Sequence, residues 1–184
     1  MRIIAGSAKG RRFEAPKGLN TRPTLDRVKE SLFGMLQFRI TNADVLDLFS
    51  GSGNLGLEAA SRGARLAVCN DSNRACAALI HSNAAMLGLS DRIRVLCLDY
   101  EAALSQLHGE GQCFDIALLD APYAGGMAQL AAAALLDLEL MRPGGQIVIE
   151  HDCRLAPVLA SSLIRRSSQR IYGAVGLTIW ECIA

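Results

Sequence analysis

The chain has 184 residues, of which 51% are hydrophobic and 20% are charged, a composition that suits one folded domain and excludes a disordered chain. No apolar run approaches the ~20 residues that span a bilayer, and the six cysteines never form a C-x-x-C pair, which argues for a cytoplasmic protein without a membrane partner, disulfides or a metal site. The net charge of +1 by itself neither predicts nor excludes a nucleic-acid partner.

The first 30 residues are strongly basic. They carry a net charge of +5, whereas the remaining 154 residues sum to −4. Residues 1–20 place short apolar and basic stretches around Gly6 and Gly10, which predicts a hairpin-like arm ahead of the main domain at 21–184. A positive arm on a mildly acidic body favours a polyanionic partner. We therefore predict RNA contacts by basic residues of this region, namely Arg2, Lys9, Arg11, Arg12 and Arg22.

The rest of the chain alternates helical stretches with apolar, strand-like runs. An apolar stripe formed by Val28, Leu32, Met35 and Leu36 predicts a helix that begins near Thr24 and reaches about residue 38. Further helices are predicted at 55–62, 73–87 and 126–140. Strands are predicted at 45–49, 65–70, 93–98, 114–119 and 145–150, followed by a closing hairpin with strands at 169–172 and 175–179.

Strand–helix units of this length predict an α/β fold, with a doubly wound, mainly parallel seven-stranded sheet, helices on both faces and an antiparallel hairpin at one edge. In such sheets, ligands bind beyond the carboxyl ends of the strands. Four acidic residues occupy those ends, namely Asp47, Asp71, Asp99 and Asp120. We therefore expect a ligand site at this edge of the sheet.

A glycine-rich loop, Gly51-x-Gly53-x-x-Gly56, follows the first of these strands and opens a helix. Asp71 lies twenty residues beyond Gly51, where an acid that binds a ribose is expected. The loop suits either a dinucleotide, with its pyrophosphate at the helix N-terminus, or S-adenosylmethionine, which carries no phosphate. Asp47 favours the second ligand, because a carboxylate beside the loop repels a pyrophosphate and attracts a sulfonium or ammonium group.

The fourth strand is followed directly by Asp120-Ala121-Pro122-Tyr123. An aryl amine is a poor nucleophile, because its lone pair is delocalised into the ring. Hydrogen bonds from its N–H groups to the Asp120 carboxylate and the Ala121 carbonyl would direct that lone pair at a methyl donor. Pro122 restricts Ala121 to extended geometry, and Tyr123 would stack on an unpaired base. The segment predicts the catalytic residues of an amine methyltransferase.

Longer runs of sequence carry a family resemblance. They are Leu46-Asp47-Leu48-Phe49-Ser50-Gly51-Ser52-Gly53, Thr21-Arg22-Pro23-Thr24 with Asp26-Arg27-Val28-Lys29-Glu30, and Tyr172-Gly173. With the Asp-Ala-Pro-Tyr segment, which has Ala121 where the first proline of the usual Asp/Asn-Pro-Pro-Tyr/Phe signature stands, the chain resembles the RsmD family of bacterial 16S ribosomal RNA guanine-N2 methyltransferases. The resemblance implies a class I methyltransferase fold, S-adenosylmethionine as donor, and N2 of one guanine in small-subunit rRNA as acceptor.

The predicted donor site combines the glycine loop with the acidic strand ends and their neighbours. Asp99 lies where a carboxylate can accept a hydrogen bond from the adenine amino group, although aspartate is also a common turn residue. The predicted donor set is Asp47, Phe49, Gly51, Ser52, Gly53, Gly56, Asp71, Ser72, Asp99, Tyr100 and Asp120, with no metal ion.

Two other functions fit the same residues. An enzyme of the same chemistry could act on adenine N6 in DNA, but DNA sequence readers usually need an added recognition domain, for which 184 residues leave little room. A catalytically weak protein that binds S-adenosylmethionine or RNA in ribosome assembly would accommodate Ala121. The leading prediction is a monomeric rRNA enzyme whose partner is 16S rRNA in the small ribosomal subunit or its assembly intermediate.

Overall fold

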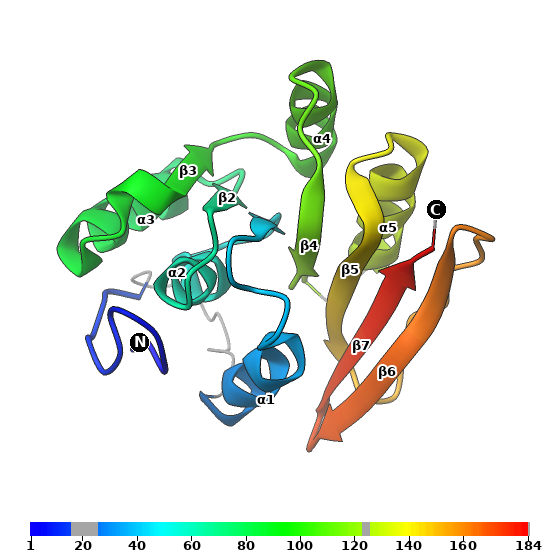
Figure 1. Cartoon of the computed structure of the whole chain (residues 1–184), viewed down its shortest axis with the longest axis horizontal. Helices are drawn as coiled ribbons and strands as arrows, with labels where there is room; N and C mark the ends of the chain where they lie inside the picture. The colour runs from blue at the N-terminus through cyan, green and yellow to red at the C-terminus, as the bar shows by residue number, and fades with distance from the viewer. Residues whose placement is uncertain (16–25, 123–125, 184) are drawn as a thin grey trace.

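The computed structural model describes residues 1–15, 26–122 and 126–183, except for the side chains of residues 166 and 167. Its strands are β1 Asp44–Asp47, β2 Leu66–Asn70, β3 Ile93–Leu96, β4 Phe114–Leu119, β5 Met141–Asp152, β6 Ile164–Tyr172 and β7 Val175–Cys182. They form one sheet in the order β3-β2-β1-β4-β5-β7-β6 (Figure 1). Neighbours from β3 to β5 pair in parallel, whereas β7 pairs antiparallel with β5 and β6. The predicted doubly wound sheet with its closing hairpin is confirmed.

Helices cover both faces of the sheet (Figure 1). They are α1 Asp26–Leu36, α2 Asn54–Ser61, α3 Arg74–Leu87, α4 Tyr100–Gly109 and α5 Met127–Asp137, with a short 3-10 helix, η1, at Ser90–Arg92. α1, α2 and α3 bury Leu36, Leu55 and Ile80 against one face. α4 and α5 bury Leu104 and Leu135 against the other. Each face of the sheet therefore has its own apolar core.

The sequence pattern identifies most of these elements but misses α4. Its buried positions are only Ala103, Leu104 and Leu107, too few for a clear helical stripe. The fifth strand is also longer than predicted, because β5 pairs with β4 on one side and with β7 on the other. No helix in the described ranges has the length and apolar character needed to cross a membrane.

The N-terminal arm, which the structure describes over residues 1–15, folds back on itself and packs mainly on helices (Figure 1). Ile3 donates its backbone N–H to Arg11 and accepts from that of Gly10. The arm's buried side chains face α2 and α3, in a cluster of Ile3, Ala8, Phe13, Leu57, Ala60, Ala84, Leu87 and Leu89. The predicted hairpin-like arm is present, and its apolar side is part of the folded domain.

A fully buried glutamate, Glu58 of α2, anchors the arm. Its carboxylate accepts hydrogen bonds from the backbone N–H groups of Ile4 and Ala5, at 2.8 and 3.0 Å. Arg62 Nε donates to it at 2.7 Å, and the buried Lys29 Nζ lies 3.4 Å away. Burial lowers the pKa of Lys29, while the Glu58 charge opposes that shift. These contacts compensate Glu58 for the solvation that it loses.

We expect Glu58→Ala to lower the free energy of unfolding by about 3–5 kcal/mol, because the change leaves Lys29 buried without its carboxylate and frees two arm N–H groups. Urea unfolding measures this loss. Glu110→Ala is the matched control: this glutamate pairs with Arg94 at the surface, so its loss should cost about 0–1 kcal/mol. Equal losses in the two variants would contradict the anchoring role of Glu58.

Candidate active site

The glycine loop joins β1 to α2 and has a backbone shape that glycine permits. Gly51 and Gly53 adopt positive φ angles of 55° and 83°, and Gly53 is the N-cap of α2. At Gly56 the constraint is space, because a β-carbon there would lie 2.2 Å from Cys69 Sγ on β2. The loop therefore lies directly against the carboxyl ends of β1 and β2.

Asp47, the last residue of β1, is buried beneath this loop. One carboxylate oxygen, Oδ2, accepts a hydrogen bond from Gly56 N at 2.8 Å. The other, Oδ1, is buried and finds no hydrogen-bond donor among the described residues. Burial raises the pKa of the Asp47 carboxyl to about 7; the Gly56 hydrogen bond opposes this shift and the nearby Asp120 charge adds to it. Such an oxygen is suited to accept a hydrogen bond from a cationic ligand.

Asp71 follows β2 and connects that strand to the glycine loop. Its Oδ2 accepts from Gly51 N at 2.8 Å, and its Oδ1 accepts from Asn73 N at 2.9 Å. Each carboxylate oxygen can accept a second hydrogen bond, so Asp71 retains capacity for ligand hydroxyl groups. The neighbouring Ser72 is exposed on the same turn.

Asp99 and Tyr100 lie where β3 gives way to α4. Asp99 is exposed and caps the helix, with Oδ1 accepting from Ala102 N at 2.9 Å. The ring of Tyr100 lies 5.9 Å from that of Phe49, which follows β1, with the planes tilted by 47°. Both rings are partly exposed, so the structure brings these residues together at the rim of the predicted donor site.

The described part of the Asp-Ala-Pro-Tyr segment directly follows β4 and lies beside β1. Asp120 follows the strand that pairs with β1, and its charge adds to the effect of burial, which raises the pKa of Asp47. The Ala121 side chain is buried in the core on the α5 face, whereas Pro122 is exposed. Tyr123 lies outside the described residues.

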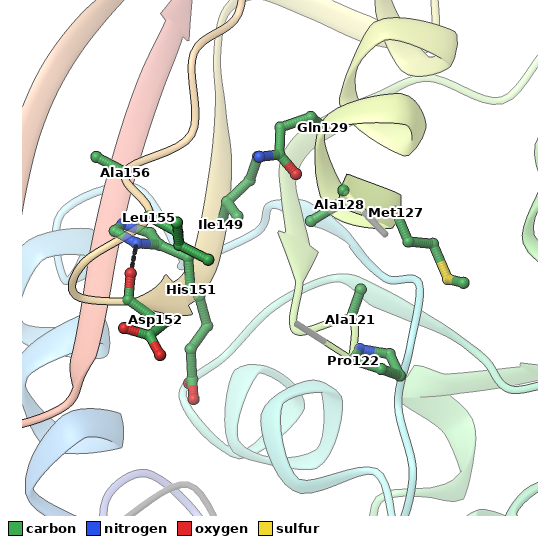
Figure 2. Close-up of a pocket in the computed structure, with 12 residues that line it drawn as sticks. Ala121, Pro122, Met127, Ala128, Gln129, Ile149, His151, Asp152, Leu155 and Ala156 are labelled. Atoms are coloured by element: carbon green, nitrogen blue, oxygen red, sulfur yellow. Dashed lines mark hydrogen bonds between the residues drawn. The ribbon is translucent and has the colours of Figure 1, made fainter. Parts of the chain in front are cut away.

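A cavity of about 340 Å³ opens beside Ala121 and Pro122 (Figure 2). Its other walls are the start of α5, the end of β5 and the segment that follows β5, with Gly126, Met127, Ala128, Gln129, Ile149, Glu150, His151, Asp152, Leu155 and Ala156 as lining residues. His151 Nδ1–H donates to the Asp152 carbonyl at 2.8 Å, and the His151 Nε2 atom is 2.9 Å from the Thr178 hydroxyl. The volume lies at the lower end of the ~300–1,000 Å³ range of small-molecule pockets.

Among the residues predicted to bind the methyl donor, Ser52 faces the N-terminal arm. Its hydroxyl donates to Met1 Sδ at 2.9 Å, and its carbonyl accepts from Asn83.

Asn54, at the start of α2, accepts from Lys29 Nζ at 2.9 Å. Sequence reasoning did not assign Lys29 a role. Its burial could have been predicted from its position in the sequence, because Lys29 lies four residues before the buried Phe33, on the apolar face of α1.

The predicted RNA-binding residues have different surroundings. Arg11 donates to the carbonyls of Leu87 and Met86 at the end of α3, so it has a structural role there. Arg2 pairs with Asp26 on the surface. Lys9 and Arg12 are exposed and have no ion pair in the described part of the chain, while Arg22 lies outside it.

Comparisons with known proteins match nearly the whole chain. The family model described as "Conserved hypothetical protein 95" matches residues 1–181. "Ribosomal RNA small subunit methyltransferase D" of Escherichia coli is 32% identical over 183 residues, covering 98% of this chain and 89% of the relative. The solved structure of yhhF from Escherichia coli has a TM-score of 0.89 at 31% identity, covering 100% of this chain and 98% of that one.

The fold extends to more distant enzymes. An RNA methyltransferase from Salinibacter ruber, solved in complex with S-adenosyl-L-homocysteine, has a TM-score of 0.67 at 19% identity, covering 88% of this chain and 94% of that one. At this identity the likeness shows the fold alone, which is the class I Rossmann-like fold predicted from the sequence.

We expect Asp47 to make stability depend on pH. Its pKa is about 7 in the folded protein against an ordinary 3.8, so between these values the folded state holds a proton that the unfolded chain lacks. Stability therefore falls as pH rises through this window, by up to about 1.4 kcal/mol per pH unit. Asp47→Asn should remove this dependence, and urea unfolding across the window measures the difference.

The control for this experiment is Asp91→Asn, a change to an exposed carboxylate in η1. Its unfolding free energy should follow the wild-type pH dependence. If the Asp47→Asn and wild-type curves run parallel, the raised pKa of Asp47 is wrong.

Proposed function

This chain belongs to the RsmD family, whose model matches residues 1–181, and from that premise we propose that it transfers a methyl group from S-adenosylmethionine to the N2 amine of one guanine in 16S rRNA. The observation that carries the proposal is the position of Asp120 and Ala121 between two features. On one side lies the buried Asp47 beneath the glycine loop, and on the other lies the cavity beside Pro122.

The residues around the glycine loop fit S-adenosylmethionine. The buried Asp47 Oδ1, which lacks a donor among the described residues, suits the ammonium group of the methionyl part. Asp71 can accept from the ribose hydroxyls with the capacity left on its carboxylate. Phe49 and Tyr100 offer apolar ring surface to the adenine, and Asp99 offers its exposed carboxylate to the adenine amino group.

The cavity fits a base that has left its stack, because it is bounded by Ala121 and Pro122 and has both polar and apolar walls. There the Asp120 carboxylate and the Ala121 carbonyl would each accept a hydrogen bond from one N–H of the amine. These two hydrogen bonds would direct the nitrogen lone pair toward the methyl donor. When bound, S-adenosylmethionine supplies a sulfonium methyl group, whose bonding electron pair stays with sulfur as the new C–N bond forms. Asp120 would receive the proton that the amine then loses.

A labelled-methyl transfer assay tests the proposal. The substrates are small ribosomal subunits lacking the modification, the corresponding naked 16S rRNA and adenine-containing duplex DNA, with nucleoside analysis of the products. We expect N2-methylguanosine from one of the two ribosomal substrates. N6-methyladenine in the DNA would favour the alternative acceptor. Binding of S-adenosylmethionine without transfer to any substrate would favour a noncatalytic role in ribosome assembly.

We expect Asp120→Asn to lower the rate of methyl transfer by about 100-fold or more, because the amide cannot take the proton and accepts hydrogen bonds on only one of its two polar atoms. Affinity for S-adenosylhomocysteine, measured by calorimetry, should be nearly unchanged. A loss of ligand affinity as large as the loss of rate would contradict a role at the acceptor.

The matched change on the donor side is Asp71→Ala. It should weaken binding of S-adenosylhomocysteine by roughly 1.5–3 kcal/mol, because it removes a charged acceptor of hydroxyl hydrogen bonds. Unchanged affinity would show that the end of β2 does not hold the ribose. Together the two variants separate donor binding from amine activation.

We expect the double change Lys9→Glu with Arg12→Glu to weaken binding to 16S rRNA and to make the dependence of log affinity on log salt shallower, by about 0.7–0.9 for each phosphate that is no longer neutralised. Both side chains are exposed, so the melting temperature should change little. An unaltered salt slope would refute RNA binding by the arm, even if methyl transfer fell.

Arg11→Ala is the control for the arm. Because Arg11 donates to the carbonyls of Leu87 and Met86, this change should lower the melting temperature. The comparison distinguishes basic residues that hold the arm in place from those available to a phosphate.

A further inference from the structure

In the proposed function, the Asp120–Pro122 segment binds the amino group of the base. Adenine also carries an amino group, so this segment alone would not select guanine. Guanine differs in the atoms beside its amine, since N1–H is a donor and O6 an acceptor on the same edge of the base. A site that selects guanine needs an acceptor and a donor facing that edge. We infer that the amide of Gln129 supplies this pair, an inference that rests on the proposed function.

Gln129 is in the first turn of α5 and lines the cavity together with Ala121 and Pro122. The amide oxygen Oε1 lies near the N-cap of α5, 3.7 Å from where a β-carbon of Gly126 would be, and Figure 2 shows the amide nitrogen on the side of Ile149. The side chain is half-buried, and within the described residues its amide makes no hydrogen bond. A half-buried amide without a protein partner at the wall of a cavity can form hydrogen bonds with a ligand in that cavity.

The chemistry of the amide matches guanine better than adenine. With the guanine amine at Asp120, the adjacent edge presents N1–H and O6, which Gln129 Oε1 and Nε2 can bind together. With the adenine amine at Asp120, the corresponding edge presents an N1 acceptor and a C–H group, which offer the amide a single hydrogen bond. Guanine therefore makes one more hydrogen bond and leaves no amide atom unpaired in the cavity.

The test uses 2-aminopurine, which keeps the N2 amine but lacks both N1–H and O6. The guanine that the wild-type protein modifies is first located by nucleoside analysis. The same 16S rRNA is then assembled by ligation with guanine or 2-aminopurine at that position, and reconstituted into small subunits. The value of kcat/KM is measured on both substrates for the wild type, Gln129→Leu and Gln129→Glu. Gln106→Leu, the same change on the surface of α4, is the matched control.

We expect the wild type to prefer guanine over 2-aminopurine by about 10-fold to 100-fold, as for a bidentate pair that discriminates between bases. Gln129→Leu should lose rate on guanine by a similar factor while its rate on 2-aminopurine changes little, so that the preference disappears. Gln129→Glu keeps the acceptor for N1–H and loses the donor to O6, so its preference should be intermediate. Gln106→Leu should keep the full preference.

Other results overturn the inference. If the wild type methylates guanine without preference, or if Gln129→Leu keeps the preference, another group reads the base and the proposed function still stands. An equal loss on both substrates means that Gln129 only shapes the cavity. If Gln129→Leu does not fold by circular dichroism, Gln129→Glu decides by the same comparison. If the wild type transfers no methyl group to guanine N2, the proposed function fails and the inference with it.

Discussion

The candidate site depends on one close approach, that of α2 to the ends of β1 and β2. Residue 56 has no side chain, and a β-carbon there would collide with Cys69 Sγ at 2.2 Å. The approach brings Gly56 N within 2.8 Å of Asp47 Oδ2, so the buried carboxylate and the glycine loop form one rigid unit. The position of the glycine loop and the burial of Asp47 follow from this packing, and burial in turn raises the pKa of Asp47.

The same helix connects the site to the N-terminal arm through buried charges. Glu58 holds two backbone N–H groups of the arm, while Lys29 donates to Asn54 at the start of α2 and to the carbonyl of Arg2. A buried lysine keeps such a position only when its donors are satisfied. The arm that we propose to contact RNA is therefore linked to the glycine loop through Lys29 of α1, which donates to both, and by the Ser52 hydroxyl, which donates to Met1 Sδ.

The site divides into two halves with different chemistry. One half holds the carboxylates of Asp47 at the end of β1, Asp71 after β2 and Asp99 after β3. The half beyond β4 and β5 is a cavity whose walls combine apolar surface with a few polar groups. Asp120 lies between these halves, and its charge adds to the effect of burial, which raises the pKa of Asp47. In the proposed function, the methyl donor would occupy the first half and the nucleobase the second, with Asp120 between them.

The sequence by itself determined the fold class, the glycine loop and the acidic ends of the strands, because each depends on local periodicity or on a short motif. It also placed Asp47, Asp71 and Asp120 at one edge, since parallel strands present their carboxyl ends together. Only the tertiary structure assigned Arg11 to the end of α3, buried Lys29 beside Glu58, and brought Gln129 to the cavity beside Ala121. These contacts join residues that are far apart in the chain or separated by a turn. They are determined by side-chain packing, which the local sequence pattern does not encode.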